Sequence, residues 1–289
     1  MTAASIQSSA VFSLPSERTG EVYQISLAFP ESYFADPTKT FPVVYTIDAN
    51  IEFEAVVGLA RLMQLGGRIP EFVVVGIGYP LAGNYGDGLA EFGKRRARDL
   101  TSTTDERYGR FIADAFNVDG TIETGGSEQF LGFIADELLP LIEGQYRLDP
   151  DDRTLLGHSA GGHFALYALL RRPQLFSRYA VGSPSLGLGD GRLFDLEQDH
   201  ASKSADLPVR LFLGIGSEEE PSTHSQTSYM GQIISVSLVN RFTALLQGRG
   251  YQNLSMSTKV FEGHGHFDVF GPFVTTALDY LFSSLVTPR

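Results

Sequence analysis

A serine between glycines offers the clearest chemistry in this chain. Residues 154–162 read TLLGHSAGG, which places Ser159 at the centre of a Gly-x-Ser-x-Gly motif. An apolar run precedes the motif, and residues 160–171 have the composition of a helix. A sharp strand-to-helix turn lifts the serine hydroxyl above the strand end, and glycines are needed beside it because side chains would collide there. The pattern predicts a nucleophilic serine at a helix N-terminus, where backbone N–H groups favour negative charge.

A serine hydroxyl needs a general base, and in the α/β-hydrolase fold, where this motif occurs, the chain order is serine, acid, histidine. His264 and His266 follow the last predicted strand, in the segment EGHGHF (262–267). We predict His266 as the base, with His264 as the alternative. The His-x-His spacing also suits two metal ligands, but the sequence offers no third ligand, so we predict no metal. The other histidines are interpreted as packing, rim or loop residues: His158, His163, His200 and His224.

The acid that orients the base is expected after the apolar strand ending at Ile215. The sequence there is GSEEE (216–220). A Gly-x-x-acid spacing, common in this fold, selects Glu219. Glu218 and Glu220 stay open as alternatives, and so does an acid elsewhere, with this segment as an acidic surface loop.

The oxyanion of an acyl-transfer reaction needs two backbone N–H groups directed at the developing charge. Ala160, directly after the nucleophile, is expected to supply one of them. The second is expected from Asn50, in the turn Asp48-Ala49-Asn50 after an early strand. The other interpretation of this turn is a simple helix start with Asn50 as a cap.

Strand-like and helix-like segments alternate along the chain, which predicts a mostly parallel central sheet flanked by helices. The predicted strands are 21–29, 42–48, 72–77, 153–156, 208–215 and 254–261, and the predicted helices are 52–65, 129–146, 160–171 and 272–285, with a kink at Pro140. We predict one domain, 1–289, with excursions over the active site at about 78–127 and 186–206. The span 217–232 is expected to form loops or short helices.

Composition narrows the class of protein. The net charge of −12 over 289 residues argues against a nucleic-acid partner. The chain has no cysteine, which excludes disulfides, thiolate catalysis and cysteine-based zinc sites. No apolar stretch is long enough to span a bilayer, and the first twenty residues lack the features of a signal peptide. We therefore expect a cytoplasmic protein with a small-molecule substrate and no membrane partner; the oligomeric state is not indicated.

These motifs give the chain a family resemblance. It resembles the esterase D or putative-esterase family of α/β-hydrolases, which includes enterobactin-type siderophore trilactone hydrolases. The matching stretches are FPVVYTIDAN (41–50), EFVVVGIGYP (71–80), RARDLTST (96–103), the block 125–186, LFLGIGSEEE (211–220) and EGHGHFDV (262–269). The resemblance implies a Ser–His–acid esterase without a cofactor. The family's Gly-x-x-His pattern falls on Gly263 and His266, and Ala49 replaces the glycine that usually precedes the oxyanion donor, here Asn50.

The resemblance also implies candidate substrate contacts. The stretch Arg-x-Arg-Asp-Leu-Thr often lies beside the substrate in relatives, which makes Arg96, Arg98 and Thr101 candidates, and we add His158 beside the nucleophile. The residues alone leave open whether the basic run 94–98 faces an anionic substrate or is a solvated surface. We predict a serine carboxylic ester hydrolase for small-molecule esters, with siderophore trilactones among the candidates. The alternatives are a thioesterase or acyltransferase and a catalytically inactive binding protein.

Overall fold

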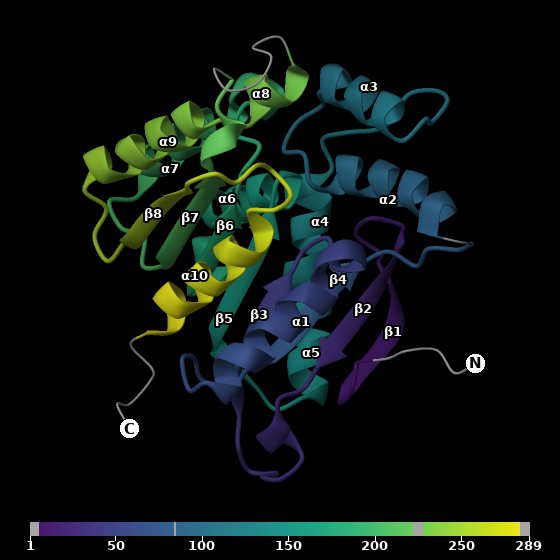
Figure 1. Cartoon of the computed structure of the whole chain (residues 1–289), viewed down its shortest axis with the longest axis vertical. Helices are drawn as coiled ribbons and strands as arrows, with labels where there is room; N and C mark the ends of the chain where they lie inside the picture. Colours follow the sequence, from purple (N-terminus) through teal and green to yellow (C-terminus); the bar gives the residue numbers. More distant parts are fainter. Residues whose placement is uncertain (1–5, 84, 222–227, 284–289) are drawn as a thin grey trace.

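One eight-stranded sheet organises the protein (Figure 1). The structure is a computed structural model that describes residues 6–83, 85–221 and 228–283. The strand order is β1-β2-β4-β3-β5-β6-β7-β8. Their bounds are β1 Ser9–Pro15, β2 Val22–Ala28, β3 Phe41–Thr46, β4 Val73–Gly78, β5 Leu148–His158, β6 Arg178–Gly182, β7 Arg210–Gly216 and β8 Ser255–Phe261. At one edge, β1 pairs antiparallel with β2, and β2 pairs antiparallel with β4. The remaining pairs, β4-β3, β3-β5, β5-β6, β6-β7 and β7-β8, are all parallel.

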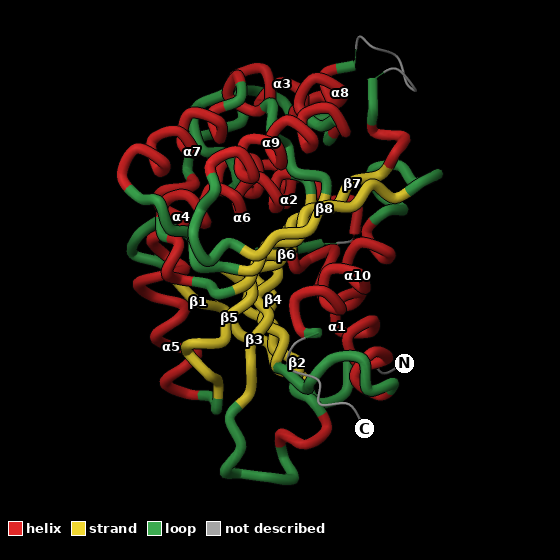
Figure 2. Tube along the Cα trace, turned by 90° about the vertical axis from the view of Figure 1, so that its left-hand side faces the viewer, coloured by secondary structure: helices red, strands yellow, loops and turns green. Residues whose placement is uncertain are grey.

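Helices cover both faces of the sheet, and this explains why the central strands are apolar throughout (Figure 2). All six residues of β4 are buried. One face packs against α1 (Ala49–Leu65) and α10 (Phe270–Phe282), through a core that includes Phe53 and Phe273. The core on the other face is formed with α2 (Tyr85–Asp99), α4 (Ser127–Phe133), α5 (Leu139–Gln145), α6 (Ala160–Arg171), α7 (Arg192–Lys203) and α9 (Val236–Arg249).

Several elements differ from the sequence-based expectation. The span 78–127, expected as a loop system or excursion, contains the helices α2 and α3 (Glu106–Ala115). Most of the span 186–206 is accounted for by α7, after the short turn η4 (Leu188–Asp190). β1, β6 and α9 were not predicted. The structure also has two short turns, η1 (Glu31–Tyr33) before β3 and η3 (Pro173–Leu175) before β6. Within 217–232 the structure has η5 (Ser217–Glu219) and α8 (Tyr229–Ile233), while 222–227, with His224, lies outside the described residues.

The helix predicted over 129–146 forms a continuous helical run, but its middle turn is π-helical. α4 ends at Phe133, a π-helical turn (η2) runs over Ile134–Leu138, and α5 spans Leu139–Gln145. Pro140 lies at the start of α5, directly after the π turn, and its ring nitrogen cannot donate to a carbonyl of that preceding turn. The wider π turn absorbs the break that a proline imposes.

Parallel strands bring their carboxyl ends to one edge of the sheet, and the polar residues of the motifs follow these ends. Asp48 follows β3, Ser159 follows β5 and Ser183 follows β6. Glu219 follows β7, and His266 follows β8. Residues far apart in sequence therefore meet at this edge. Among the described residues, none of the helices has both the length and the hydrophobicity needed to span a bilayer.

Candidate active site

Ser159 lies on a sharp turn between β5 and α6. Its backbone has φ 60° and ψ −121°, a conformation that is strained for a residue with a side chain. The turn is so tight that a Cβ at Gly157 would collide with the carbonyl oxygen of Gly161, and a Cβ at Gly162 would collide with that of Gly182. The backbone N–H of Ser159 donates to the carbonyl of Gly182 at 2.9 Å, which fixes the turn against β6. Gly157 of the motif, and Gly162 directly after it, are therefore required by backbone contact.

The structure brings Ser159, His266 and Glu219 into one chain of hydrogen bonds. His266 Nε2 lies 3.0 Å from Ser159 Oγ, and His266 Nδ1 lies 2.7 Å from Glu219 Oε2. With a proton on Nδ1, the imidazole donates to the carboxylate and accepts from the serine hydroxyl at Nε2. This tautomer is the one that a general base needs.

The carboxylate of Glu219 is held on its second oxygen as well. Oε1 accepts from Ser183 Oγ at 2.6 Å and from the backbone N–H of Gly216 at 2.9 Å, and the residue is only 8% exposed. Glu220 is directed elsewhere, because its carboxylate accepts from the N–H and the hydroxyl of Ser237. Of the three adjacent glutamates, Glu219 is the one that contacts His266. Ser183, a site residue that the sequence analysis missed, lies directly after β6, which was not predicted either.

His264 has a different partner from His266. Its Nδ1 lies 2.8 Å from Asp268 Oδ2, and Asp268 Oδ1 accepts from the N–H of Gly265 at 3.0 Å. The carbonyl of His264 accepts from the N–H of Glu218 at 3.0 Å. These contacts shape the loop that presents His266. In the described part of the chain, no group of three His, Cys, Asp or Glu side chains is arranged to hold a metal ion.

The two expected oxyanion donors both lie at helix N-termini, where backbone N–H groups have no intrahelical acceptor. Ala160 is the first residue of α6, and Asn50 is the second residue of α1. The Asn50 side chain is already engaged: Oδ1 accepts from the N–H of Tyr79 and Nδ2 donates to the Tyr79 carbonyl, each at 2.8 Å. This pair of bonds ties the turn after β3 to the end of β4.

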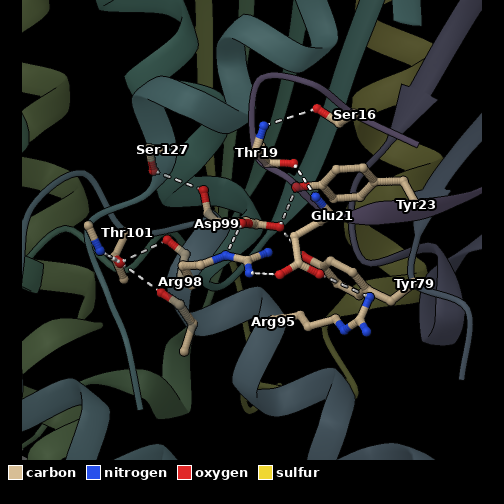
Figure 3. A network of polar contacts seen from close by, with 12 residues as sticks. Ser16, Thr19, Glu21, Tyr23, Tyr79, Arg95, Arg98, Asp99, Thr101 and Ser127 are labelled. Carbon is tan, nitrogen blue, oxygen red and sulfur yellow. Dashed lines mark hydrogen bonds and ion pairs between the residues drawn. The ribbon is translucent and has the colours of Figure 1, made fainter. Parts of the chain in front are cut away.

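The candidate substrate residues Arg96 and Arg98 form internal ion pairs. Arg96 is buried and binds Asp48 with two hydrogen bonds. Arg98 donates to Asp99 at 2.7 Å and to Glu21 at 2.5 Å (Figure 3). Asp99, in turn, also accepts from the hydroxyl of Tyr23 at 2.9 Å.

Thr101 is equally engaged inside the protein. Its hydroxyl donates to the carbonyl of Ala97 at 2.7 Å and accepts from the N–H of Gly125 at 2.6 Å. The stretch 96–101 therefore binds other parts of the protein: Arg96 and Arg98 are ion-paired, and the Thr101 hydroxyl is hydrogen-bonded to the backbone.

Two more histidines lie beside the nucleophile and are buried. The His158 ring is 4.8 Å from that of His266, between centroids, and its Nε2 has no hydrogen-bond partner among the described residues. Burial, then the neighbouring His266 and Arg96, lower the pKa of His158 well below its usual value, so the ring is neutral. His163 bonds the carbonyl of Ser185 and the hydroxyl of Ser102, and burial lowers its pKa to about 4. Both rings are therefore neutral and buried.

A small, mainly apolar hollow adjoins His266. It has a volume of about 150 Å³, and Pro221, Met230 and Ile234 line it together with the imidazole. A hollow of this size, beside the imidazole that is hydrogen-bonded to Ser159, can accept a short acyl or alcohol group of an ester.

Comparison with known proteins decides the family. Residues 16–220 match the family model described as "Putative esterase". The chain belongs to the putative-esterase family. This family acts on esters, so the protein is an ester hydrolase.

Proteins named as siderophore esterases or hydrolases resemble the chain. Ferri-bacillibactin esterase BesA of Bacillus subtilis (strain 168) is 29% identical over 277 residues, which cover 92% of this chain and 87% of BesA. The siderophore enterobactin esterase of Emericella nidulans is 32% identical over 173 residues, 57% of this chain and 54% of that protein. The solved siderophore hydrolase EstB from Aspergillus nidulans superposes with a TM-score of 0.77 at 24% identity, covering all of both chains. The α/β-hydrolase fold is thereby confirmed.

Proposed function

We propose that this putative-esterase member cleaves siderophore esters through a covalent acyl-enzyme on Ser159. The observation that carries the mechanism is the chain of hydrogen bonds from Ser159 Oγ through His266 to Glu219, at 3.0 Å and 2.7 Å. A serine hydroxyl is a weak nucleophile at neutral pH, and an adjacent imidazole activates it by accepting its proton.

In the first half of the reaction, Ser159 Oγ attacks the ester carbonyl while His266 Nε2 takes the hydroxyl proton. The imidazolium that forms is stabilised by the carboxylate of Glu219, which Ser183 and Gly216 hold in place. The negative charge moves to the carbonyl oxygen, and the N–H groups of Ala160 and Asn50 receive it. Both donors belong to the first turn of a helix, so the helix dipoles favour the same charge.

In the second half, the tetrahedral intermediate collapses. His266 gives its proton to the leaving alkoxide, which departs as an alcohol, and Ser159 keeps the acyl group. Water then donates a proton to His266 and attacks the acyl-enzyme, and the collapse of the second intermediate returns the proton to Ser159. One ester bond is broken and one water is consumed, with no net change in charge on the enzyme.

The substrate class rests on the relatives. The names of BesA and of the Emericella nidulans protein describe them as esterases of siderophores, and BesA aligns with 92% of this chain. The hollow at His266 is too small for a whole siderophore, at about 150 Å³. It suits a single ester arm, with the remainder of a large substrate lying outside.

The test compares hydrolysis of a catecholate trilactone, with and without ferric iron, with hydrolysis of p-nitrophenyl acetate. We expect a higher kcat/KM for the trilactone, and loss of all three activities in Ser159→Ala. Turnover of p-nitrophenyl acetate alone would reject the siderophore substrate and leave a general esterase. Full activity in Ser159→Ala would reject the mechanism.

A further inference from the structure

A second, larger hollow lies at the same end of the molecule as the catalytic residues, and the reaction described above does not use it. Its volume is about 580 Å³. It is bounded by α3, the loop after β6, α7, α8 and α9, and Figure 1 shows α3 and α8 close together at this end. Part of its wall is the backbone of Gly187. A side chain cannot replace this glycine without strain, because a Cβ there would collide with the carbonyl oxygen of Gln232.

Two arginines in this hollow differ from most others in the protein. The guanidinium of Arg107 lies over the ring of Tyr229, at 5.3 Å from the centroid, and donates to Gln232 Oε1 at 2.5 Å. The guanidinium of Arg241 lies over the ring of Phe194, at 4.3 Å. Within residues 6–83, 85–221 and 228–283, neither forms an ion pair, whereas Arg95, Arg96 and Arg98 all do. In a chain of net charge −12, two unpaired guanidinium groups held on aromatic rings are available for an anion.

The carboxylates in the same hollow are mostly engaged. Asp105 accepts from the N–H groups of Tyr108 and Gly189, each at 2.9 Å. Two others face arginines, since Glu106 pairs with Arg110 at 3.4 Å and Asp195 pairs with Arg192 at 3.7 Å. The fourth, Asp190, is exposed on the wall of the hollow. Its negative charge repels an anionic ligand, so a variant that removes this charge should bind such a ligand more tightly.

The short helix α8 separates the two hollows. Tyr229, Gln232 and Ile233 face the arginine-lined hollow, while Met230, Gly231 and Ile234 line the small hollow at His266. A helix with its side chains is roughly 10 Å across. A ligand that occupies both sides of α8 must therefore be large, with its anionic part roughly 10 Å from the ester.

We propose that the hollow between α3, α8 and α9 is a subsite for a bulky anionic aromatic part of the ester substrate, with Arg107 and Arg241 as its anion contacts. An iron-bound catecholate group has this chemistry: it is multiply negative and presents flat rings to guanidinium groups. The inference rests on the proposed siderophore function and adds the residues that select the charged form of the substrate.

Binding is tested directly in the Ser159→Ala background, by calorimetric titration with the ferric catecholate trilactone. We expect Arg107→Met and Arg241→Met each to weaken binding about tenfold, as expected for the loss of one charged hydrogen bond, and the double variant to weaken it further. Asp190→Asn should tighten binding. Arg68→Met is the matched control: it removes the same charge from an exposed pair with Asp279, outside the hollow, and should leave the affinity unchanged.

Turnover separates failure of this inference from failure of the proposed function. In the enzyme that retains Ser159, the double variant Arg107→Met/Arg241→Met should have a lower kcat/KM for the ferric complex because its KM rises. Its rate on p-nitrophenyl acetate should stay within about twofold of wild type. Unchanged affinity and turnover in the double variant, while wild type cleaves the trilactone, would overturn the subsite alone. An equal loss on p-nitrophenyl acetate would also overturn it. A wild type that cleaves no trilactone would instead reject the proposed function.

Discussion

Arg96 binds Asp48 through two parallel hydrogen bonds, with Nε 3.0 Å from Oδ1 and Nη2 2.7 Å from Oδ2. Asp48 has a left-handed backbone, with φ 54°, and directly precedes α1, two residues before the expected oxyanion donor Asn50. Its Oδ2 would lie 3.4 Å from a Cβ at Gly161, so the pair lies beside the first turn of the nucleophile helix α6. The ion pair thus joins α2 to the oxyanion turn beside the start of α6, and we assign Arg96 a positioning role in place of a substrate contact.

Replacing Arg96 should therefore affect every substrate alike. We expect Arg96→Met to lower kcat/KM by about 10- to 100-fold for the neutral p-nitrophenyl acetate and for an anionic ester, because a small shift of the oxyanion turn is costly. Parallel steady-state kinetics on the two esters give the comparison. A rise of KM confined to the anionic ester would return Arg96 to the substrate.

The ion pair between Arg96 and Asp48 should also contribute to the free energy of unfolding. Arg96→Met leaves a buried carboxylate without its partner, and we expect a loss of about 3–5 kcal/mol in the free energy of unfolding. Urea titration measures this loss, and Arg96→Met/Asp48→Asn is the control because it removes both charges. The double variant should be more stable than Arg96→Met. Equal stability of the two would show that the pairing of these charges is unimportant.

The three adjacent glutamates give a clean comparison for the acid. Glu219→Gln should lower kcat, but by a factor roughly 50 to 100 smaller than Ser159→Ala, since the acid orients and supports the base. Glu218→Gln and Glu220→Gln are matched controls one residue away and should stay within about threefold of wild type. Burst and steady-state assays of the four variants decide the assignment. The largest loss in either control would move the acid to that residue.

The two histidines after β8 should separate equally clearly. His266→Ala is expected to remove turnover, because His266 Nε2 is the group bonded to Ser159 Oγ. His264→Ala should retain turnover within about tenfold, because it removes only a loop contact to Asp268. The outcome contrary to our assignment is an inactive His264→Ala beside an active His266→Ala.

Stability should fall on mild acidification because of His163. Burial lowers its pKa from 6.5 to about 4 in the folded state, so the neutral ring stabilises the fold fully above pH 6.5 and this contribution is lost as the pH falls towards 4. Over this window the effect is about 3 kcal/mol. We expect His163→Gln to show a smaller decrease in unfolding free energy between pH 7 and pH 5 than wild type. Identical slopes would show that His163 does not release its proton on folding.

The sequence was most informative where a local pattern dictates structure. The apolar runs around β3, β4 and β7 predicted buried parallel strands, and the motif around Ser159 predicted its turn, because both depend on neighbouring residues. Counting from Gly216 also selected Glu219, which the structure brings to His266. The reasons that distinguish Glu219 from Glu218, chiefly the contact with Ser183, are tertiary and carry no local signal.

Where tertiary partners decide, the sequence was less informative. α2 carries a weak helical pattern because ion pairs hold its polar side: Arg96 meets Asp48, and Arg98 meets Glu21 across 77 positions of the chain. The same separation explains why Arg96 and Arg98 were expected at the substrate, since nothing near them in sequence reveals their partners. The five-residue strand β6 was not predicted, and Ser183 was missed with it.

The most direct test of the central claim is the site of covalent labelling by a fluorophosphonate, located by peptide mass spectrometry with ester hydrolysis followed in parallel. We predict one phosphonyl group per chain on Ser159, loss of ester hydrolysis in proportion to labelling, and neither labelling nor hydrolysis in Ser159→Ala. Modification of another residue with loss of activity, or an active Ser159→Ala, would contradict the assignment of Ser159 as the nucleophile.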